Sequence, residues 1–150
     1  MVYVLGASST TSPIPKIVYD AGWALNGNMK NGNSYYGYTL PLGPSNGGPL
    51  FFEHYSFMAI NPMGLSDTYA NYETQAKNHT LINRAYCIAN PKGFPNYGAD
   101  CWGLTASDTY NGYTASSPNN DVGTIAPTAA LASMPYTPTE SMQALRFFLL

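Results

Sequence analysis

The sequence has little charge. Of its 150 residues only 9% are Asp, Glu, Lys or Arg, against about 25% in ordinary soluble domains. The formal net charge is −2. The six cations stand singly along the chain: Lys16, Lys30, Lys77, Arg84, Lys92 and Arg146. Because nucleic-acid binding depends on clustered cations that displace phosphate counterions, the sequence argues against a nucleic-acid partner.

Long apolar runs are also missing. None approaches the ~20 residues that a membrane-spanning helix needs, so no membrane partner is expected. Residues 1–7 are apolar but lack the positively charged region of a signal peptide. A chain of this length is the usual size of one domain, and an aromatic content of 14% argues against disorder.

Cysteine is scarce, and its spacing argues against a metal site. Cys87 and Cys101 are the only two cysteines, and the two histidines, His54 and His79, have no clear third ligand. We therefore expect no metal and no cofactor, and hydrogen-bonded structural or sugar-contacting histidines. A Cys87–Cys101 disulfide, closing a loop of about 15 residues, and a pair of buried free thiols both fit the sequence.

Tyrosine, glycine, proline and small polar residues take the place of charge. They are concentrated at 101–113, where Trp102, Tyr110 and Tyr113 alternate with hydroxyl groups, an amide and the carboxylate of Asp108. Flat apolar faces beside hydrogen-bonding groups suit a neutral polyhydroxylated ligand. An ordinary turn with buried aromatic residues would have the same composition, so both interpretations stay open.

Helix signals recur along the chain, whereas no segment alternates like a strand. Proline or hydroxyl residues at Ser12, Pro49, Pro127 and Thr137 predict helix starts, the last as part of a Thr137–Glu140 capping box. The predicted helices cover 13–21, 50–60, 67–89, 127–134 and 138–150, with long loops at 22–48 and 93–123. We expect an all-α fold with long loops. Since the outer segments are apolar and uncapped, we expect a partial domain over 1–150, truncated at both ends.

Five blocks in a fixed order carry a family resemblance. They are Gly47–Phe52, His54–Ser56, Asn78–Arg84, Cys101–Asp108 and Gly123–Ala130. Together they make the chain similar to the bacterial glycoamylase-like domain family, which includes the β-1,2-glucan hydrolases of glycoside hydrolase family 144. The resemblance covers nearly the whole chain.

The resemblance implies an (α/α)6 toroid, of which this chain would form about half. It implies a glycoside hydrolase acting on a β-linked glucan oligosaccharide or polysaccharide, in the periplasm or secreted. The missing remainder of the domain would be a partner, and the fragment alone could be inactive. The alternative is a non-catalytic carbohydrate-binding or structural remnant of such a domain.

Two carboxylates are the candidate catalytic residues, because glycoside hydrolysis needs an acid and a second carboxylate. Glu53 lies in an otherwise apolar predicted helix, where burial would favour the protonated form of a general acid. In the alternative interpretation, Glu53 lies on the one exposed stripe of that helix. Asp108 suits catalysis or a hydrogen bond to a sugar hydroxyl; in the alternative interpretation it is an aspartate that only stabilises a turn. The residues predicted to bind substrate are His54, Tyr55, Trp102, Thr105, Tyr110 and Tyr113.

Overall fold

The computed structural model describes residues 2–150. Its α-helices are α1 (Val2–Ala7), α2 (Lys16–Val18), α3 (Phe51–Ser56), α4 (Tyr72–Ala89), α5 (Pro127–Ala132) and α6 (Pro138–Leu149). Between α2 and α3 lie a π-helix, η1 (Tyr19–Trp23), and two short 3₁₀ helices, η2 (Leu25–Gly27) and η3 (Ser45–Gly47). The strands form two antiparallel hairpins: β1 (Ser34–Tyr35) with β2 (Tyr38–Thr39), and β3 (Ala106–Thr109) with β4 (Gly112–Ala115). The protein is therefore helix-rich with two small two-stranded sheets, which the expected all-α fold with long loops did not include.

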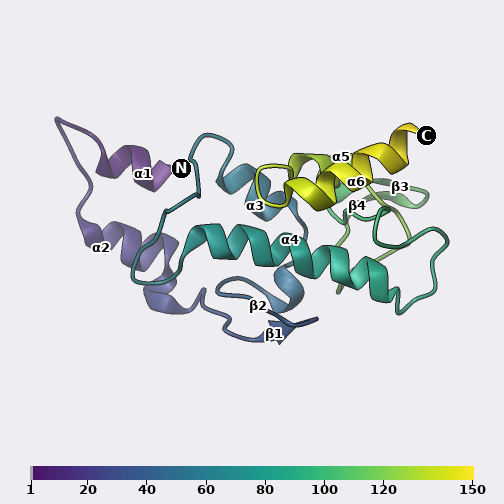
Figure 1. Cartoon of the computed structure of the whole chain (residues 1–150). Helices are drawn as coiled ribbons and strands as arrows, with labels where there is room; N and C mark the ends of the chain where they lie inside the picture. Colours follow the sequence, from purple (N-terminus) through teal and green to yellow (C-terminus); the bar gives the residue numbers. More distant parts are fainter. Residues whose placement is uncertain (1) are drawn as a thin grey trace.

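The longest helix, α4, organises the molecule. It runs across the structure, with α1 and α2 toward one end and α5, α6 and the β3–β4 hairpin toward the other (Figure 1). Asn71 caps its first turn by accepting from the Thr74 amide, and a left-handed Asn90 ends it before Pro91. The predicted end at Ala89 is confirmed. The predicted start at Asp67 is wrong, because that carboxylate instead accepts from the Tyr69 and Ala70 amides and closes a turn.

Other helix boundaries differ from the predictions for local reasons. The helix predicted from 13 begins at Lys16, and Pro15 stands at its cap without a side-chain bond. Helix α3 ends four residues early, where Phe57 leaves the helical region. No side chain caps α6: the Thr137 hydroxyl is buried and contacts Ser133 and Ser141 instead, so the predicted capping box does not form.

The apolar core lies between α4, α5, α6 and the segment 102–104. From this segment Trp102 and Leu104 are fully buried in the core, where they pack with small residues of the helices. Gly103 permits this contact: a Cβ there would stand 2.8 Å from the Ala126 oxygen. Cys87 and Cys101 are both buried free thiols, and burial raises the pKa of Cys87 to about 12. The free-thiol alternative is the one that the structure bears out.

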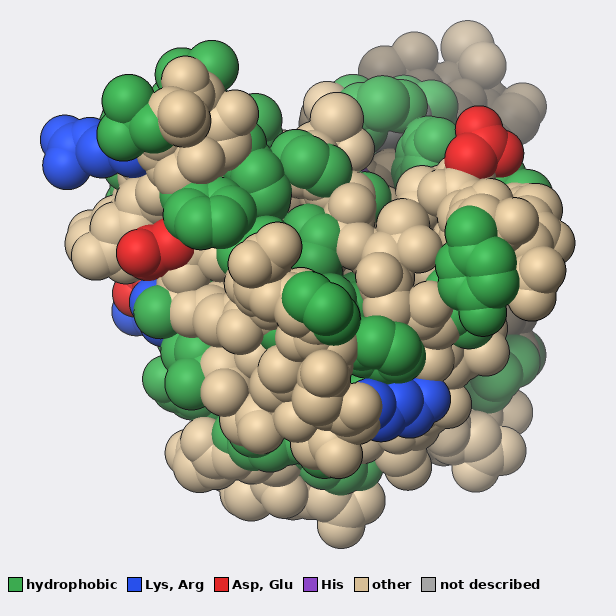
Figure 2. Space-filling model, turned by 90° about the vertical axis from the view of Figure 1, so that its right-hand side faces the viewer, with side chains coloured by type: hydrophobic (Ala, Val, Ile, Leu, Met, Phe, Trp, Pro, Cys, Tyr) green, Lys and Arg blue, Asp and Glu red, His purple; other side chains and the backbone are tan. Residues whose placement is uncertain are grey.

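Few charges appear on the surface. Figure 2 shows one face on which hydrophobic side chains are spread between uncharged polar groups, with isolated patches of either charge. Within residues 2–150 no helix is long and apolar enough to cross a membrane.

Candidate functional site

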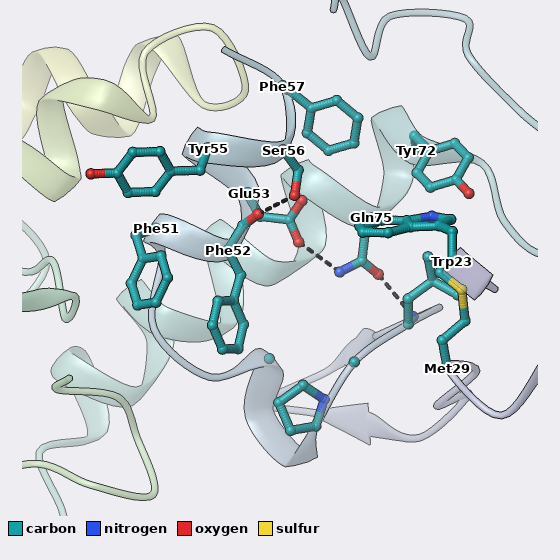
Figure 3. A pocket seen from close by; sticks show the side chains of 14 residues that line it. Trp23, Met29, Phe51, Phe52, Glu53, Tyr55, Ser56, Phe57, Tyr72 and Gln75 are labelled. Atoms are coloured by element: carbon teal, nitrogen blue, oxygen red, sulfur yellow. Dashed lines mark hydrogen bonds between the residues drawn. The ribbon is translucent and has the colours of Figure 1, made fainter. Parts of the chain in front are cut away.

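Helix α3 separates two pockets. The first has a volume of about 340 Å³, and aromatic side chains from α3 form part of its wall together with Trp23, Tyr72 and Gln75 (Figure 3). The second, of about 300 Å³, lies between α3, the β3–β4 hairpin and α5. Phe51 and Tyr55 border both pockets, so the two form neighbouring sites on either side of one helix.

Glu53 stands at the wall of the first pocket. Its side chain is buried, and its exposed fraction is only 5%. One carboxyl oxygen, Oε1, accepts from Gln75 Nε2 at 2.7 Å and contacts His79 Nδ1 at 3.0 Å. Among residues 2–150 no hydrogen bond reaches Oε2, which lies on the side of Ser56 in Figure 3. The carboxylate is therefore held through Oε1, and Oε2 is available for a further hydrogen bond.

The orientation of the Gln75 amide follows from its second partner. Its Oε1 accepts from the Leu42 backbone N–H at 2.9 Å. A backbone N–H can only donate, so the Gln75 oxygen must face Leu42 and its NH₂ group must face Glu53. The loop before α3 thus determines which group Gln75 presents to the carboxylate.

His79 is fully buried on α4, one turn after Gln75. Its Nε2 lies 3.0 Å from the carbonyl oxygen of Gly48. The neighbouring Gly47 has a φ of +87°, and a Cβ there would stand 2.1 Å from His79 Cδ2. The imidazole therefore packs directly on the backbone of the Gly47–Gly48 turn, which only glycine at position 47 allows.

The second pocket contains a histidine whose tautomer can be read from its partners. The Ser133 hydroxyl donates to the Ala129 oxygen, so it can only accept from His54 Nε2, 3.0 Å away. In neutral His54 the other nitrogen, Nδ1, is then an acceptor. Burial, and secondly the charge of His79, lower the pKa of His54 below its ordinary value of 6.5, while Glu53 opposes the shift.

The structure brings four of the predicted binding residues together. The second pocket is bordered by His54, Tyr55, Thr105 and Tyr113. The Thr105 hydroxyl also accepts from the Phe51 amide at 3.1 Å, which ties the base of the hairpin to the start of α3. His54 and Tyr55 come from one block of the family resemblance and Thr105 from another, whereas Tyr113 lies outside the blocks, and the fold gathers all four at one site.

The other predicted residues lie elsewhere. Trp102 has an exposed fraction of 0% and belongs to the apolar core. Its ring has no face free for a ligand, so the prediction that Trp102 binds substrate is wrong. Asp108 is exposed on β3, opposite Tyr113 on β4. Tyr110, 82% exposed, lies at the tip of the same hairpin. Neither Asp108 nor Tyr110 borders a pocket with Glu53.

The sequence reasoning missed Gln75 and underestimated His79. The signal was present, because the two residues stand four apart and therefore share one face of α4 with other polar groups that the structure buries. A run of polar residues on the inner face of a helix indicates a buried hydrogen-bond network. No group of three His, Cys, Asp or Glu side chains within residues 2–150 is arranged to hold a metal ion.

Comparison with known proteins gives consistent matches. Residues 1–149 match the sequence model of the Glycoamylase family, described as "putative glucoamylase". An exo β-1,2-glucooligosaccharide sophorohydrolase (non-reducing end) from Parabacteroides distasonis is 52% identical over 133 residues, which are 85% of this chain and 18% of that protein.

Solved structures match over nearly the whole chain. The endo-β-1,2-glucanase from Chitinophaga pinensis, in complex with sophorotriose and glucose, is 50% identical with a TM-score of 0.93; the match covers 98% of this chain and 37% of that one. The structure of a "putative glucoamylase" from Bacteroides uniformis is 60% identical with a TM-score of 0.93, covering 98% and 36%. The chain therefore spans well under half the length of these proteins.

Proposed function

The chain belongs to the Glycoamylase family, and from this we propose that it supplies part of the active site of a glycoside hydrolase that cleaves β-1,2-glucan. The names of two similar proteins, an exo-acting sophorohydrolase and an endo-β-1,2-glucanase, support this substrate. In the proposed whole protein the helices of this chain form part of an (α/α)6 toroid. The matched share of the glucanase chain, 37%, is nearer a third than the half expected.

The arrangement of Glu53 carries the proposal. Hydrolysis of a glycosidic bond needs a carboxyl group that transfers a proton at the scissile oxygen. Glu53 is buried, borders the first pocket, is oriented by two partners at Oε1, and has no hydrogen bond to Oε2 from residues 2–150. A carboxyl group held in this way needs little reorganisation before it reacts, and this preorganisation is a large part of enzymatic rate enhancement.

The two pockets offer places for sugars on both sides of the reacting bond. Phe51 and Tyr55 border both pockets and provide flat faces on which sugar rings pack. On the far side of α3, His54 Nδ1 can accept a hydrogen bond from a sugar hydroxyl. We propose that a glucan chain passes over α3 and places its scissile bond near Glu53.

The second carboxylate is less well defined. Catalysis and sugar contact are both open for Asp108, and its exposed place on the hairpin supports sugar contact beside Tyr113 and Tyr110. In this proposal the partner carboxylate comes from the remainder of the whole domain, which acts in the periplasm or outside the cell.

A comparison of two proteins tests the proposal. Reducing-end formation from β-1,2-glucan is measured with this chain and with a longer protein extended to the length of the relatives. We expect turnover by the longer protein, its loss in Glu53→Gln, and none by the chain alone. Turnover by the longer protein that Glu53→Gln leaves unchanged would refute the role of Glu53.

A non-catalytic glucan-binding role is the second candidate. The second pocket favours it, because it combines aromatic, hydroxyl and imidazole groups without a carboxylate. Titration calorimetry with sophorotriose separates the two: binding by the longer protein without any turnover would support the binding role alone.

A further inference from the structure

We propose that a third pocket, next to the first, binds a further glucosyl unit of the glucan, and that Trp23 is the face on which this sugar ring packs. The inference rests on the proposed function in one respect, that the ligand is a glucan. Trp23 is not among the residues that the sequence predicted to bind substrate.

The third pocket continues the line of the other two. It lies between α1, η1 and the segment before α4, and its volume of about 460 Å³ is within the range of roughly 300–1,000 Å³ that is usual for ligand sites. The residues that it shares with the first pocket are Trp23, Ser56, Phe57 and Tyr72. Figure 3 draws Trp23 and Tyr72 on one side of the first pocket, and on the other side Phe51 and Tyr55, which border the second. The first pocket is therefore the middle one of three.

Trp23 offers a supported but accessible ring at the junction of two pockets. It is the last residue of η1, a wide turn in which the Ala24 amide bonds to the Tyr19 carbonyl oxygen five residues back, at 3.0 Å. Turns of this kind are frequent at functional sites. The ring centroid of Tyr3 lies 6.2 Å from that of Trp23, yet the tryptophan is still 41% exposed. An exposed indole at a pocket border is suited to stacking against the apolar face of a sugar.

Polar groups of the same pocket form one cluster around Asp67. The phenols of Tyr19 and Tyr72 both donate to Asp67 Oδ2, the second at 2.7 Å, and the two phenol oxygens lie 2.9 Å apart. Asp67 Oδ1 accepts from the amides of Tyr69 and Ala70 at 2.7 and 3.0 Å. Asp67 and both phenols border the third pocket.

The protons of this cluster determine which ligand groups complement it. Burial by itself raises the pKa of Asp67, but the hydrogen bonds from the phenols and amides lower it below its ordinary value of 3.8, so the group is a carboxylate. Burial raises the pKa of Tyr72 to about 12 and also raises that of Tyr19, so both phenols keep their protons. These two protons serve three oxygen–oxygen contacts within the cluster. None is left for a ligand, so the cluster offers acceptor oxygens, which hydroxyl donors complement.

A neutral sugar fits these groups better than an anion does. Lys16, a cation at the border of the pocket, is paired with Asp20 at 2.5 Å, so an anion would face the Asp67 carboxylate without a free counter-charge. A sugar ring combines an apolar face for Trp23 with hydroxyl donors for the Asp67 cluster. Because the pocket adjoins the one in which we propose the scissile bond, its occupant would be a further unit of the same glucan chain.

Fluorescence tests whether the glucan reaches Trp23. Trp102 is the only other tryptophan of this chain and is fully buried. In the longer protein, the difference between wild type and Trp23→Phe isolates the Trp23 signal. We expect acrylamide to quench this signal, and β-1,2-glucan to protect it. A Trp23 signal that is already shielded without glucan would mean that the remainder of the domain covers the ring, and would overturn the inference, as would a signal that glucan leaves unchanged.

Calorimetry with β-1,2-glucan measures how much the contacts contribute. Trp23→Ala should weaken binding by about 5- to 10-fold, the usual effect of a lost aromatic contact. Tyr19→Phe keeps the ring but removes one acceptor oxygen, and should weaken binding by about 2- to 10-fold. If Tyr19→Phe lowers the unfolding temperature and leaves the affinity unchanged, the cluster is structural and does not recognise the sugar.

Tyr36→Ala is the matched control for exposure. Tyr36 is 46% exposed, close to the value for Trp23, and borders none of the three pockets. Its replacement should change the affinity by less than about twofold. Equal losses in Tyr36→Ala and Trp23→Ala would reject the third pocket as a sugar site. If the wild-type longer protein binds no glucan, the proposed function and this inference both fail; if it binds glucan and Trp23→Ala binds equally well, only this inference fails.

Discussion

The first pocket and the β3–β4 hairpin both combine a carboxylate with aromatic rings, yet the surroundings of the two carboxylates are opposite. Glu53 is buried and held at one oxygen by two side chains of α4. Asp108 is exposed, and no hydrogen bond to its carboxylate is found within residues 2–150. The hairpin also shows its tyrosines to solvent, since Tyr113 is 73% exposed.

The difference shows why composition alone does not locate a reactive group. A carboxylate in water is surrounded by solvent dipoles that must reorganise during a reaction, whereas one fixed by protein donors does not have this cost. The hairpin has more aromatic and polar side chains close together in the sequence, but only α3 and α4 hold a carboxylate in a fixed position. We therefore propose that Glu53 takes part in the chemistry and that the hairpin contacts the sugar.

The largest expected effect comes from exchanging each carboxylate for its amide in the longer protein. Glu53→Gln should lower kcat on β-1,2-glucan by about 10²–10⁴-fold, the usual contribution of general acid–base catalysis. Asp108→Asn should lower kcat/KM by less than about tenfold, as expected for one weakened hydrogen bond. Reducing-end assays measure both. A loss in Asp108→Asn as large as that in Glu53→Gln would remove the contrast and make Asp108 catalytic.

A second pair contrasts a buried and an exposed aromatic ring. Trp102→Ala should reduce the free energy of unfolding by roughly 3–5 kcal/mol, because it empties part of the core. Tyr113→Ala should change it by no more than about 0.5 kcal/mol, since the ring is mostly in solvent. Urea denaturation of the longer protein measures both, and a mild effect of Trp102→Ala would mean that the ring is not part of the core.

The pH dependence of stability sharpens the description of the second pocket. The folded state lowers the pKa of His54, so the unfolded chain binds more protons below about pH 6.5. Stability should therefore fall as the pH decreases through 6.5 and level off below the folded pKa. Urea unfolding at a series of pH values measures this slope. His54→Gln should flatten it, and an identical slope in that variant would assign it to another group.

The smallest effect is expected at the hairpin tip. Tyr110 is 82% exposed and has no hydrogen bond through its hydroxyl within residues 2–150. Tyr110→Ser should change the free energy of unfolding by less than about 0.5 kcal/mol, because surface substitutions are usually that mild. Affinity for sophorotriose, measured by calorimetry, should fall slightly. Unchanged affinity in Tyr110→Ser and Tyr113→Ala together would separate the hairpin from the glucan.

The sequence predicted the parts of the fold that local chemistry determines. The end of α4 before Pro91 and the starts of α5 and α6 at proline all follow from backbone constraints. Both hairpins were missed because their strands have only two and four residues. A usable signal existed in Tyr36-Gly37 and Asn111-Gly112, since glycine supplies the positive φ of such turns.

The site was only half predictable, and the reason is physical. Glu53 could be selected because a charge in an apolar helix is unusual. Its partners could not, because Gln75 and His79 reach it from another helix and through a loop carbonyl. Trp102 was misjudged for the same kind of reason: only the close approach of Gly103 to α5 shows that the ring points into the core.

The structure is sensitive to substitution at Gly47, although this residue has no functional group of its own. Any side chain at 47 would meet the His79 ring, and the ring has no room to retreat because it is enclosed. The disturbance would pass through the imidazole to the carboxylate of Glu53. A screen of random variants would therefore score this glycine as an active-site residue, and an engineer who wished to alter the loop would have to redesign α4 with it.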